Sequence, residues 1–211
     1  MPNRYSTDLT DEQWDLIRRF LPTEQEGRGR PMELEVREVV DAILYVLRTG
    51  CQWANLPNDY PNANSVYYHY RKWCLDGTWR RVNRALRQRE REDRDRDSEP
   101  TGAILDSQSI ETTEAGGPRG YDAGKGVWGR KRHVITDTVG NVLDVVVHAA
   151  DIQDRDGARL LLNRLWEQTQ KQIEKIWADG AYAGQLIDWV QESLDALLEI
   201  VEREEEQDGF E

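Results

Sequence analysis

Apolar residues recur every three or four positions in the first 86 residues, the spacing that places side chains on one face of a helix. The four series with this spacing cover residues 14–21, 36–47, 66–73 and 79–86. Thr10 and Gln13 have the form of a capping box before the first series, and Gly50 is placed to end the second helix. The pattern therefore predicts an all-α domain over residues 1–86.

The hydrophobic pattern changes to short apolar runs after residue 100. These runs predict strands at residues 103–106, 133–138, 142–149, 173–179 and 197–201. Apolar series that begin near Asp154 and Leu186 predict a helix before each of the last two strands. The order βββαβαβ, with hairpins first and right-handed crossovers afterwards, predicts a mixed sheet with helices on its faces over residues 101–211. The whole chain is then of the α+β or α/β class.

A charged segment separates the two regions. Residues 87–97 contain only Arg, Gln, Glu and Asp and offer nothing apolar to bury. Pro100 and Gly102 then mark the start of the second region. We expect residues 87–100 to form a linker or a protruding, solvated helix end.

A net charge of −12 argues against a nucleic-acid partner, because phosphate binding needs a basic surface. The distribution of the charge changes this conclusion. Residues 1–100 contain 17 Lys and Arg against 18 Asp and Glu, whereas residues 188–211 contain ten acidic residues and one basic residue. Most of the excess charge therefore lies at the C-terminal end, and local basic faces are permitted elsewhere. The chain has no apolar run near the ~20 residues of a membrane span and no signal-peptide pattern, so we expect a soluble, cytoplasmic protein.

Two aspartates follow apolar strands in similar settings. Asp106 ends the run Ala-Ile-Leu-Asp, and Asp179 ends the run Lys-Ile-Trp-Ala-Asp. A carboxylate at the end of a buried strand is costly unless it is hydrogen-bonded or coordinates a cation. The sequence therefore predicts that Asp106 and Asp179 share a metal site.

The third predicted helix presents a polar and aromatic surface that resembles the recognition helix of a helix-turn-helix. The residues predicted to contact DNA from this helix are Ser65, Tyr67, Tyr68, Arg71 and Lys72. An ordinary helical bundle with aromatic packing and a solvated basic face explains the same residues, and the sequence leaves both interpretations open.

A glycine-rich basic stretch precedes the second predicted strand. We expect it to hold DNA phosphates through Lys125, Arg130, Lys131 and Arg132, because its glycines permit a close approach. A basic surface turn is the alternative.

Other polar residues of the second region have simpler explanations. His133 and His148 lie in apolar strands without the converging ligands of a metal site, so we predict that they are structural or are ordinary polar groups that face DNA. Asp154 suits a helix cap, and Asp137 and Asp144 beside the hairpin are expected to face solvent.

Four segments together resemble bacterial insertion-sequence transposases of the DDE class, in the insertion-sequence-five group. They are Leu105–Ser109, Gly129–His133, Ala150–Ala158 and Trp177–Tyr182. The N-terminal segments Leu9–Leu21 and Gly50–Pro57 extend the resemblance over nearly the whole chain.

The resemblance implies a ribonuclease-H-like catalytic domain after a DNA-binding domain. Asp106 and Asp179 match the first two acids of the catalytic triad, which hold Mg²⁺, with Mn²⁺ able to substitute. Such an enzyme cuts at the terminal inverted repeats of an insertion sequence and joins the ends to target DNA. The implied protein is a homodimer in the bacterial cytoplasm, associated with the nucleoid when it is bound to DNA.

The third acid of the triad is a helical glutamate in a pattern with Tyr and Arg, and this pattern does not occur before Glu211. On the resemblance the chain is expected to be C-terminally truncated, with a two-metal site only if that glutamate is supplied. Glu199, Glu202 and the run 204–206 are expected to be solvated. The alternatives are an inactive remnant or DNA-binding regulator of transposition, and a ribonuclease-H-like nuclease unrelated to transposition.

Overall fold

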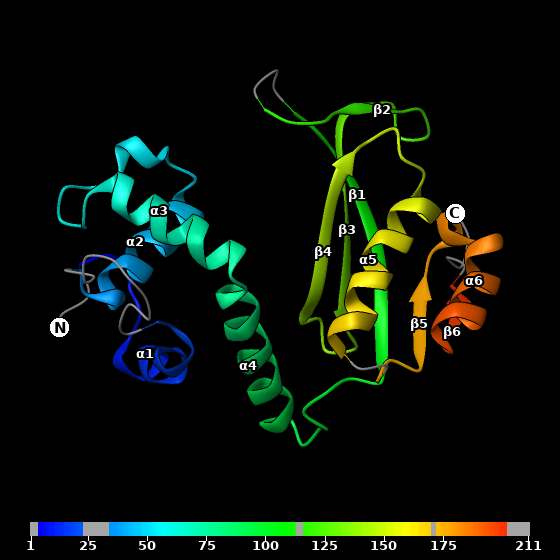
Figure 1. Ribbon diagram of the computed structural model, residues 1–211, viewed down its shortest axis with the longest axis horizontal. Helices are drawn as coiled ribbons and strands as arrows, with labels where there is room; N and C mark the ends of the chain where they lie inside the picture. Colours follow the sequence, from blue (N-terminus) through cyan, green and yellow to red (C-terminus); the bar gives the residue numbers. More distant parts are fainter. Residues whose placement is uncertain (1–3, 23–33, 113–115, 170–171, 202–211) are drawn as a thin grey trace, which may run out of the picture. The chain divides into compact units, whose positions relative to one another are not determined.

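The computed structural model describes residues 4–22, 34–112, 116–169 and 172–201. The chain divides into two compact units, Met1–Glu90 and Arg91–Glu211, and each has its own hydrophobic core. Figure 1 shows the helices of the first unit and the sheet of the second. None of the helices in the described segments is long and apolar enough to cross a membrane.

The first unit is helical, as the spacing of its apolar residues predicts. Its elements are α1 (Asp11–Ile17), the 3-10 helix η1 (Arg18–Phe20), α2 (Val36–Thr49), the 3-10 helix η2 (Trp53–Asn55), α3 (Ala63–Leu75) and α4 (Thr78–Glu92). The predicted capping box is confirmed, because the Gln13 backbone N–H donates to the Thr10 hydroxyl and the Thr10 N–H donates to the Gln13 side chain. Gly50 ends α2 in the left-handed conformation, with φ at 69°.

One face of α3 anchors this helix in the core of the first unit. Val66 and Trp73 are almost fully buried and pack with Val39 and Ile43 of α2. Burial of side chains of this size stabilises a fold by roughly 1.5–3 kcal/mol each. The opposite face of α3 is thereby fixed in a solvent-facing orientation.

The second unit is built on a mixed sheet. Its elements are β1 (Gly102–Glu111), β2 (Gly120–Asp122), β3 (Val127–Asp137), β4 (Val142–Ala149), α5 (Asp154–Thr169), β5 (Lys175–Ala178), the 3-10 helix η3 (Gly180–Tyr182), α6 (Gln185–Leu194) and β6 (Leu197–Ile200). Two features differ from the prediction. β1 and β3 are longer than expected because they pair along their whole length, and β2 lies where a glycine-rich loop was expected.

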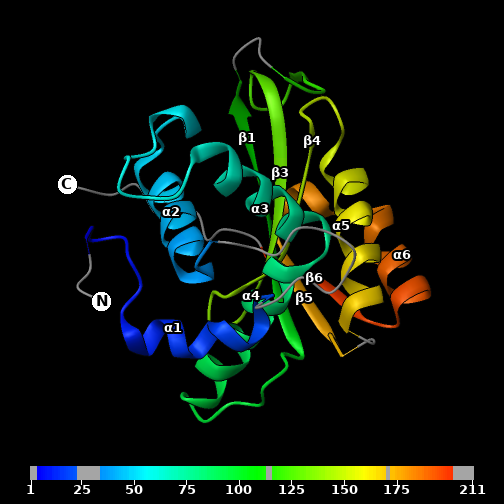
Figure 2. The same cartoon turned by 60° about the vertical axis from the view of Figure 1, so that its left-hand side comes forward.

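The strands have the spatial order β4-β3-β1-β5-β6, and β2 pairs with the start of β3. β3 is antiparallel to β1 and β4, whereas β5 is parallel to β1 and β6. The crossovers that contain α5 and α6 therefore run in the same direction along the sheet, and right-handed crossovers of this kind place both helices on one face. Figures 1 and 2 show α5 and α6 together on that face.

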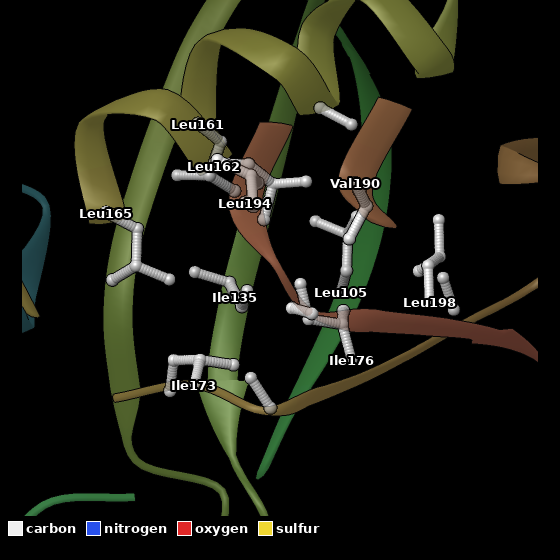
Figure 3. Close-up of a cluster of buried hydrophobic side chains, with 14 of the residues drawn as sticks. Leu105, Ile135, Leu161, Leu162, Leu165, Ile173, Ile176, Val190, Leu194 and Leu198 are labelled. Carbon is white, nitrogen blue, oxygen red and sulfur yellow. The ribbon is translucent and has the colours of Figure 1, made fainter. Parts of the chain in front are cut away.

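We call the face of the sheet against α5 and α6 the covered face, and the opposite face the open face. Figure 3 shows the core of the covered face, where Leu161 and Leu165 of α5 and Val190 of α6 pack over Leu105 and Ile176. Alternate residues of the same strands point to the open face. There Ile104 and Val147 are 43% and 58% exposed.

The charged segment after residue 86 is more buried than its composition predicts. Helix α4 continues to Glu92, and Arg91 donates from Nη1 to Asp137 Oδ2 at 3.0 Å, with both side chains buried. Asp137 also accepts the backbone N–H groups of Val139 and Asn141 in the hairpin turn. The expectation that Asp137 and Asp144 face solvent is wrong. These donors compensate the cost of burying the Asp137 charge. The Asp144 side chain is 11% exposed and accepts two hydrogen bonds from the Arg164 guanidinium of α5.

Candidate active site and nucleic-acid interface

The parallel register of β1 and β5 brings Asp106 and Asp179 side by side. Leu105 is paired with Ala178, the last residue of β5, and the two aspartates directly follow these paired residues. Because side chains alternate along a strand, Leu105 and Ala178 enter the covered core and the aspartates turn away from it. Neighbouring strands lie about 4.8 Å apart, so the two carboxylates can act on one ligand. The sequence predicted that Asp106 ends its strand. Instead, Asp106 lies in the middle of β1, which continues to Glu111.

Local hydrogen bonds orient both carboxylates. Asp179 is the N-cap of η3 and accepts the Ala181 N–H at 3.0 Å. Asp106 accepts the N–H of the next residue, Ser107, at 2.7 Å. Both aspartates are solvent-exposed, so each carboxylate keeps an accessible acceptor surface for a cation or a solvated partner.

A buried polar network lies on the covered face next to the aspartate pair. The Tyr182 hydroxyl is 2.8 Å from His133 Nδ1, and the Ser107 hydroxyl donates to Asp154 at 2.9 Å. Lys131 Nζ is 3.2 Å from the same Asp154 oxygen and 3.1 Å from Asp122. The network therefore ties β1, β2, β3, α5 and η3 together around the ends of the two strands that carry the aspartates.

Burial shifts the titration of several members of this network. Burial and the neighbouring His148 lower the pKa of His133 to about 4. Burial alone would raise the pKa of Asp122, but hydrogen bonds from Ser109 and Lys131 outweigh it and lower this pKa to about 2. Burial raises the pKa of Tyr182, so its phenol stays protonated. At neutral pH the histidine is neutral and Asp122 is charged.

Helix α5 approaches the histidines closely at Gly157. A Cβ atom there would lie 2.2 Å from His133 Nε2 and 2.3 Å from His148 Nε2. The two imidazoles stack with ring centroids 5.0 Å apart. The structural roles predicted for His133 and His148 agree with this packing. The sequence did not predict that Asp122, Asp154 and Tyr182 belong to this buried polar network. A signal existed for Tyr182, which follows Asp179 by three residues in a segment that carries the resemblance.

The aspartate pair fits a divalent cation, because Mg²⁺ binds proteins through one or two carboxylates and completes its shell with water and phosphate. Within the segments that the structure describes, no three acidic, histidine or cysteine side chains converge as a metal site. Glu199, which the sequence offered as a nearby acid, forms an ion pair with Lys175 at 2.7 Å. Glu202 and the run 204–206 lie outside the described residues.

The predicted recognition helix presents its polar face to solvent. Tyr67, Tyr68 and Arg71 are exposed, and Lys72 and Ser65 are half-buried. Tyr67, Tyr68, Arg71 and Lys72 line a surface depression together with Leu75, which is 81% exposed. Tyr67 also packs against Trp53 of η2, with ring centroids 5.3 Å apart.

The basic stretch around β3 divides between the two faces of the sheet. Arg132 is exposed on the open face and donates to Gln108, and Arg130 lies on the same face beside Pro118. Lys125 is exposed and donates from Nζ to Ser107. Lys131 was predicted to contact DNA phosphates with these residues. It is 3% exposed and forms ion pairs with two aspartates on the covered face. The buried Lys131 ammonium is therefore not accessible to DNA phosphates, and the prediction for this residue is wrong.

Comparison with known families identifies the class of protein. Residues 97–210 match the family described as "Transposase DDE domain", and residues 9–83 match the family described as "Putative transposase of IS4/5 family". The chain belongs to the DDE transposases of insertion sequences.

Two curated relatives resemble parts of the chain. An uncharacterized 16.2 kDa protein of insertion element IS402 from Burkholderia cepacia is 33% identical over 113 residues, which are 51% of this chain and 76% of the relative. The uncharacterized protein y4sN of Sinorhizobium fredii is 34% identical over 69 residues, 33% of this chain and 54% of that protein. The chain thus spans about half the length of y4sN. No solved structure matches the chain.

Proposed function

We propose that this transposase cuts DNA at the ends of an insertion sequence and joins those ends to target DNA, with Asp106 and Asp179 as its catalytic carboxylates. The observation that supports this function best is the register of two parallel strands in a DDE domain, in which Leu105 pairs with Ala178 directly before Asp106 and Asp179. We infer that residues 101–211 have a ribonuclease-H-like fold, that residues 1–86 bind DNA, and that 87–100 connect them.

Asp106 and Asp179 would hold the divalent cation, Mg²⁺ by family expectation. When bound, the cation activates a water or a 3′-hydroxyl and stabilises the leaving oxygen of the phosphodiester. The two carboxylates supply oxygen ligands and fix where the phosphodiester is held. Their own positions are fixed by the Ala181 and Ser107 N–H groups. This preorganisation limits the reorganisation that the reaction requires.

Helix α3 is the proposed reader of the insertion-sequence ends. Tyr67, Tyr68 and Arg71 project from its exposed face, and a helix can lay such a face in the major groove. Lys72 and Arg71 neutralise backbone phosphates, which positions the helix without reading the sequence. Because two ends must be brought together in transposition, we infer that the protein works as a homodimer.

Neutralisation of each catalytic carboxylate tests this function. We expect Asp106→Asn and Asp179→Asn to reduce cleavage of a labelled duplex carrying the element's terminal repeat by roughly 100-fold or more. Duplex binding by both variants is expected to match the wild type, because neither residue belongs to α3. Asp188→Asn, which removes an exposed carboxylate from α6, is the matched control and should cleave normally. Unchanged cleavage by either active-site variant in Mg²⁺ and Mn²⁺ would overturn the proposal.

A DNA-binding regulator that does not cut is the second candidate. It is favoured by the number of carboxylates, because the described segments offer two at this site and no converging third. If the chain is such a regulator, the wild type binds the terminal-repeat duplex in Mg²⁺ and in Mn²⁺ and leaves it uncut. The same assay of the wild type therefore separates the two candidates.

A further inference from the structure

A row of residues on the open face leads away from the aspartate pair along β1 and β3. Asp106 is paired with Val134, Gln108 with Arg132, and Ile110 with Arg130. Because cross-strand partners share a face, both arginines lie on the same side of the sheet as Asp106. Trp128 is the next residue of β3 on this side.

Two aromatic rings stand at the far end of this row. Tyr121 of β2 is paired with Trp128 of β3, and the rings are nearly parallel, with centroids 6.3 Å apart and planes inclined by 28°. Tyr121 is 50% exposed and Trp128 is 55% exposed. Rings buried in a core would contribute to stability, whereas these two present much of their surface to solvent.

The row is basic as well as aromatic. Arg132 is exposed, and its guanidinium donates to Gln108 across the strand pair. The Arg130 guanidinium donates from Nε to Pro118 at 3.3 Å, which holds it beside the start of β3. Lys131, between them in the chain, points to the covered face. The arginines therefore give the open face a local positive charge in a chain with a net charge of −12.

We propose that the open face between Asp106 and the Tyr121–Trp128 pair binds an unpaired DNA strand. This proposal rests on the proposed function and adds a substrate class to it. Aromatic rings stack with bases of any sequence, and arginines along a groove or face hold the backbone phosphates. A double helix keeps its bases stacked inside, so exposed rings of this kind favour nucleotides that have left the duplex.

The dimensions of the row suit this ligand. Asp106 is opposite Val134, and Trp128 lies six residues further along β3, a distance of about 20 Å at 3.4 Å per residue. A strand with its reacting phosphate at the aspartates would pass Arg132 and Arg130 before its bases reach the rings. The row thus binds the few nucleotides beside the cleavage point, and α3 binds the paired terminal repeat.

The first test measures the affinity of the full chain for a fluorescein-labelled oligothymidylate of about 12 nucleotides by anisotropy. We expect Trp128→Leu to weaken binding by about 5- to 150-fold, because it removes a stacking ring. Trp128→Phe, which keeps a ring, should bind within a few-fold of the wild type. Val147→Ala, which trims an apolar side chain on the same face, is the control and should have no effect.

A second measurement examines the arginines. Each phosphate contact to a single strand contributes about 0.7 to the slope of log affinity against log salt concentration. Arg132→Ala is expected to reduce this slope by about that amount. Arg155→Ala, which removes the same charge from the exposed surface of α5, should leave it unchanged. Photo-crosslinking of an iodouracil-substituted oligonucleotide is expected to label Tyr121 or Trp128.

The outcomes separate this inference from the proposed function. If Trp128→Leu binds the oligonucleotide as tightly as the wild type and no crosslink forms at either ring, the inference is overturned even where terminal-repeat duplexes are cleaved normally. A change in sedimentation of Trp128→Leu with unchanged oligonucleotide affinity would also overturn it, and would assign the rings to contact between copies. Loss of oligonucleotide affinity in a protein that cuts no duplex supports the inference and contradicts the proposed function.

Discussion

The two faces of the sheet are made by alternate residues of the same strands and differ in nearly every property. On the covered face, Leu105 and Ile135 pack beneath α5 and α6, and the polar residues Lys131 and His133 are bound to other buried groups. On the open face, Arg132 and the other side chains that flank Asp106 on β3 remain partly or fully exposed. Stability is therefore expected to depend on the covered face and ligand binding on the open face.

The two faces hold charged residues in different ways. On the covered face, ion-pair partners compensate the cost of burying a charge, as Asp122 and Asp154 do for Lys131. A charge on the open face is solvated and can exchange water for a ligand. Loss of a covered polar group should thus lower the free energy of unfolding, whereas loss of an open one should change ligand binding with little effect on stability.

The largest effect on stability is expected where a buried ion pair is broken. Asp137→Ala leaves the Arg91 guanidinium buried without its carboxylate and removes the acceptor of the hairpin turn. We expect a loss of about 3–5 kcal/mol in the free energy of unfolding, measured by urea denaturation. Asp144→Ala is a comparison of intermediate exposure, because its partner Arg164 can reach solvent. An equal or larger loss for Asp144→Ala would contradict the assignment.

A pair of apolar truncations compares the two faces directly. Leu162→Ala creates a cavity in the covered core and should lower the free energy of unfolding by about 2–5 kcal/mol. Val147→Ala on the open face should change it by no more than about 0.5 kcal/mol. Similar losses for both variants would show that the open face is buried in solution.

Much of the fold could be predicted because its signals are local. The helical spacing, the Thr10 capping box and the Gly50 terminus all depend on neighbours in sequence. The strand β2 and the full lengths of β1 and β3 could not be predicted, since they depend on pairing between distant segments. Burial of Asp137 was also hidden, because its partner lies 46 residues away in a segment that looks fully solvated.

The site was predictable in part for the same reason. Asp106 and Asp179 each follow an apolar run, and two such strands in parallel register bring their next residues together. The sequence also contains a signal for the different environments of Arg130, Lys131 and Arg132. Alternation along β3 places Lys131 with the buried His133 and Ile135, and places the arginines on the other side. The partners of Lys131, Asp122 and Asp154, required the tertiary structure.

The smallest of the three stability effects is a dependence on pH from the covered face. His133 faces His148, Tyr182, Asp154 and Lys131, and burial lowers its pKa to about 4. A depressed folded-state pKa stabilises the fold above the unfolded value of about 6.5, and this contribution is lost as the pH falls from about 6.5 towards 4. We expect the free energy of unfolding at pH 5 to be about 2 kcal/mol below its neutral-pH value.

Asp122 titrates in a lower window, which allows the two contributions to be separated. Its pKa of about 2 means that its stabilisation is lost as the pH falls from about 3.8 towards 2. His133→Asn should therefore flatten the dependence between pH 6.5 and 4 and leave the loss below it, whereas Asp122→Asn should do the reverse. If His133→Asn kept the wild-type slope between pH 6.5 and 4, folding would not depress the pKa of His133, and its imidazole would accept a proton in the folded state as readily as in the unfolded state. The covered face would then tolerate charge without a compensating partner, and the contrast between the two faces would fail.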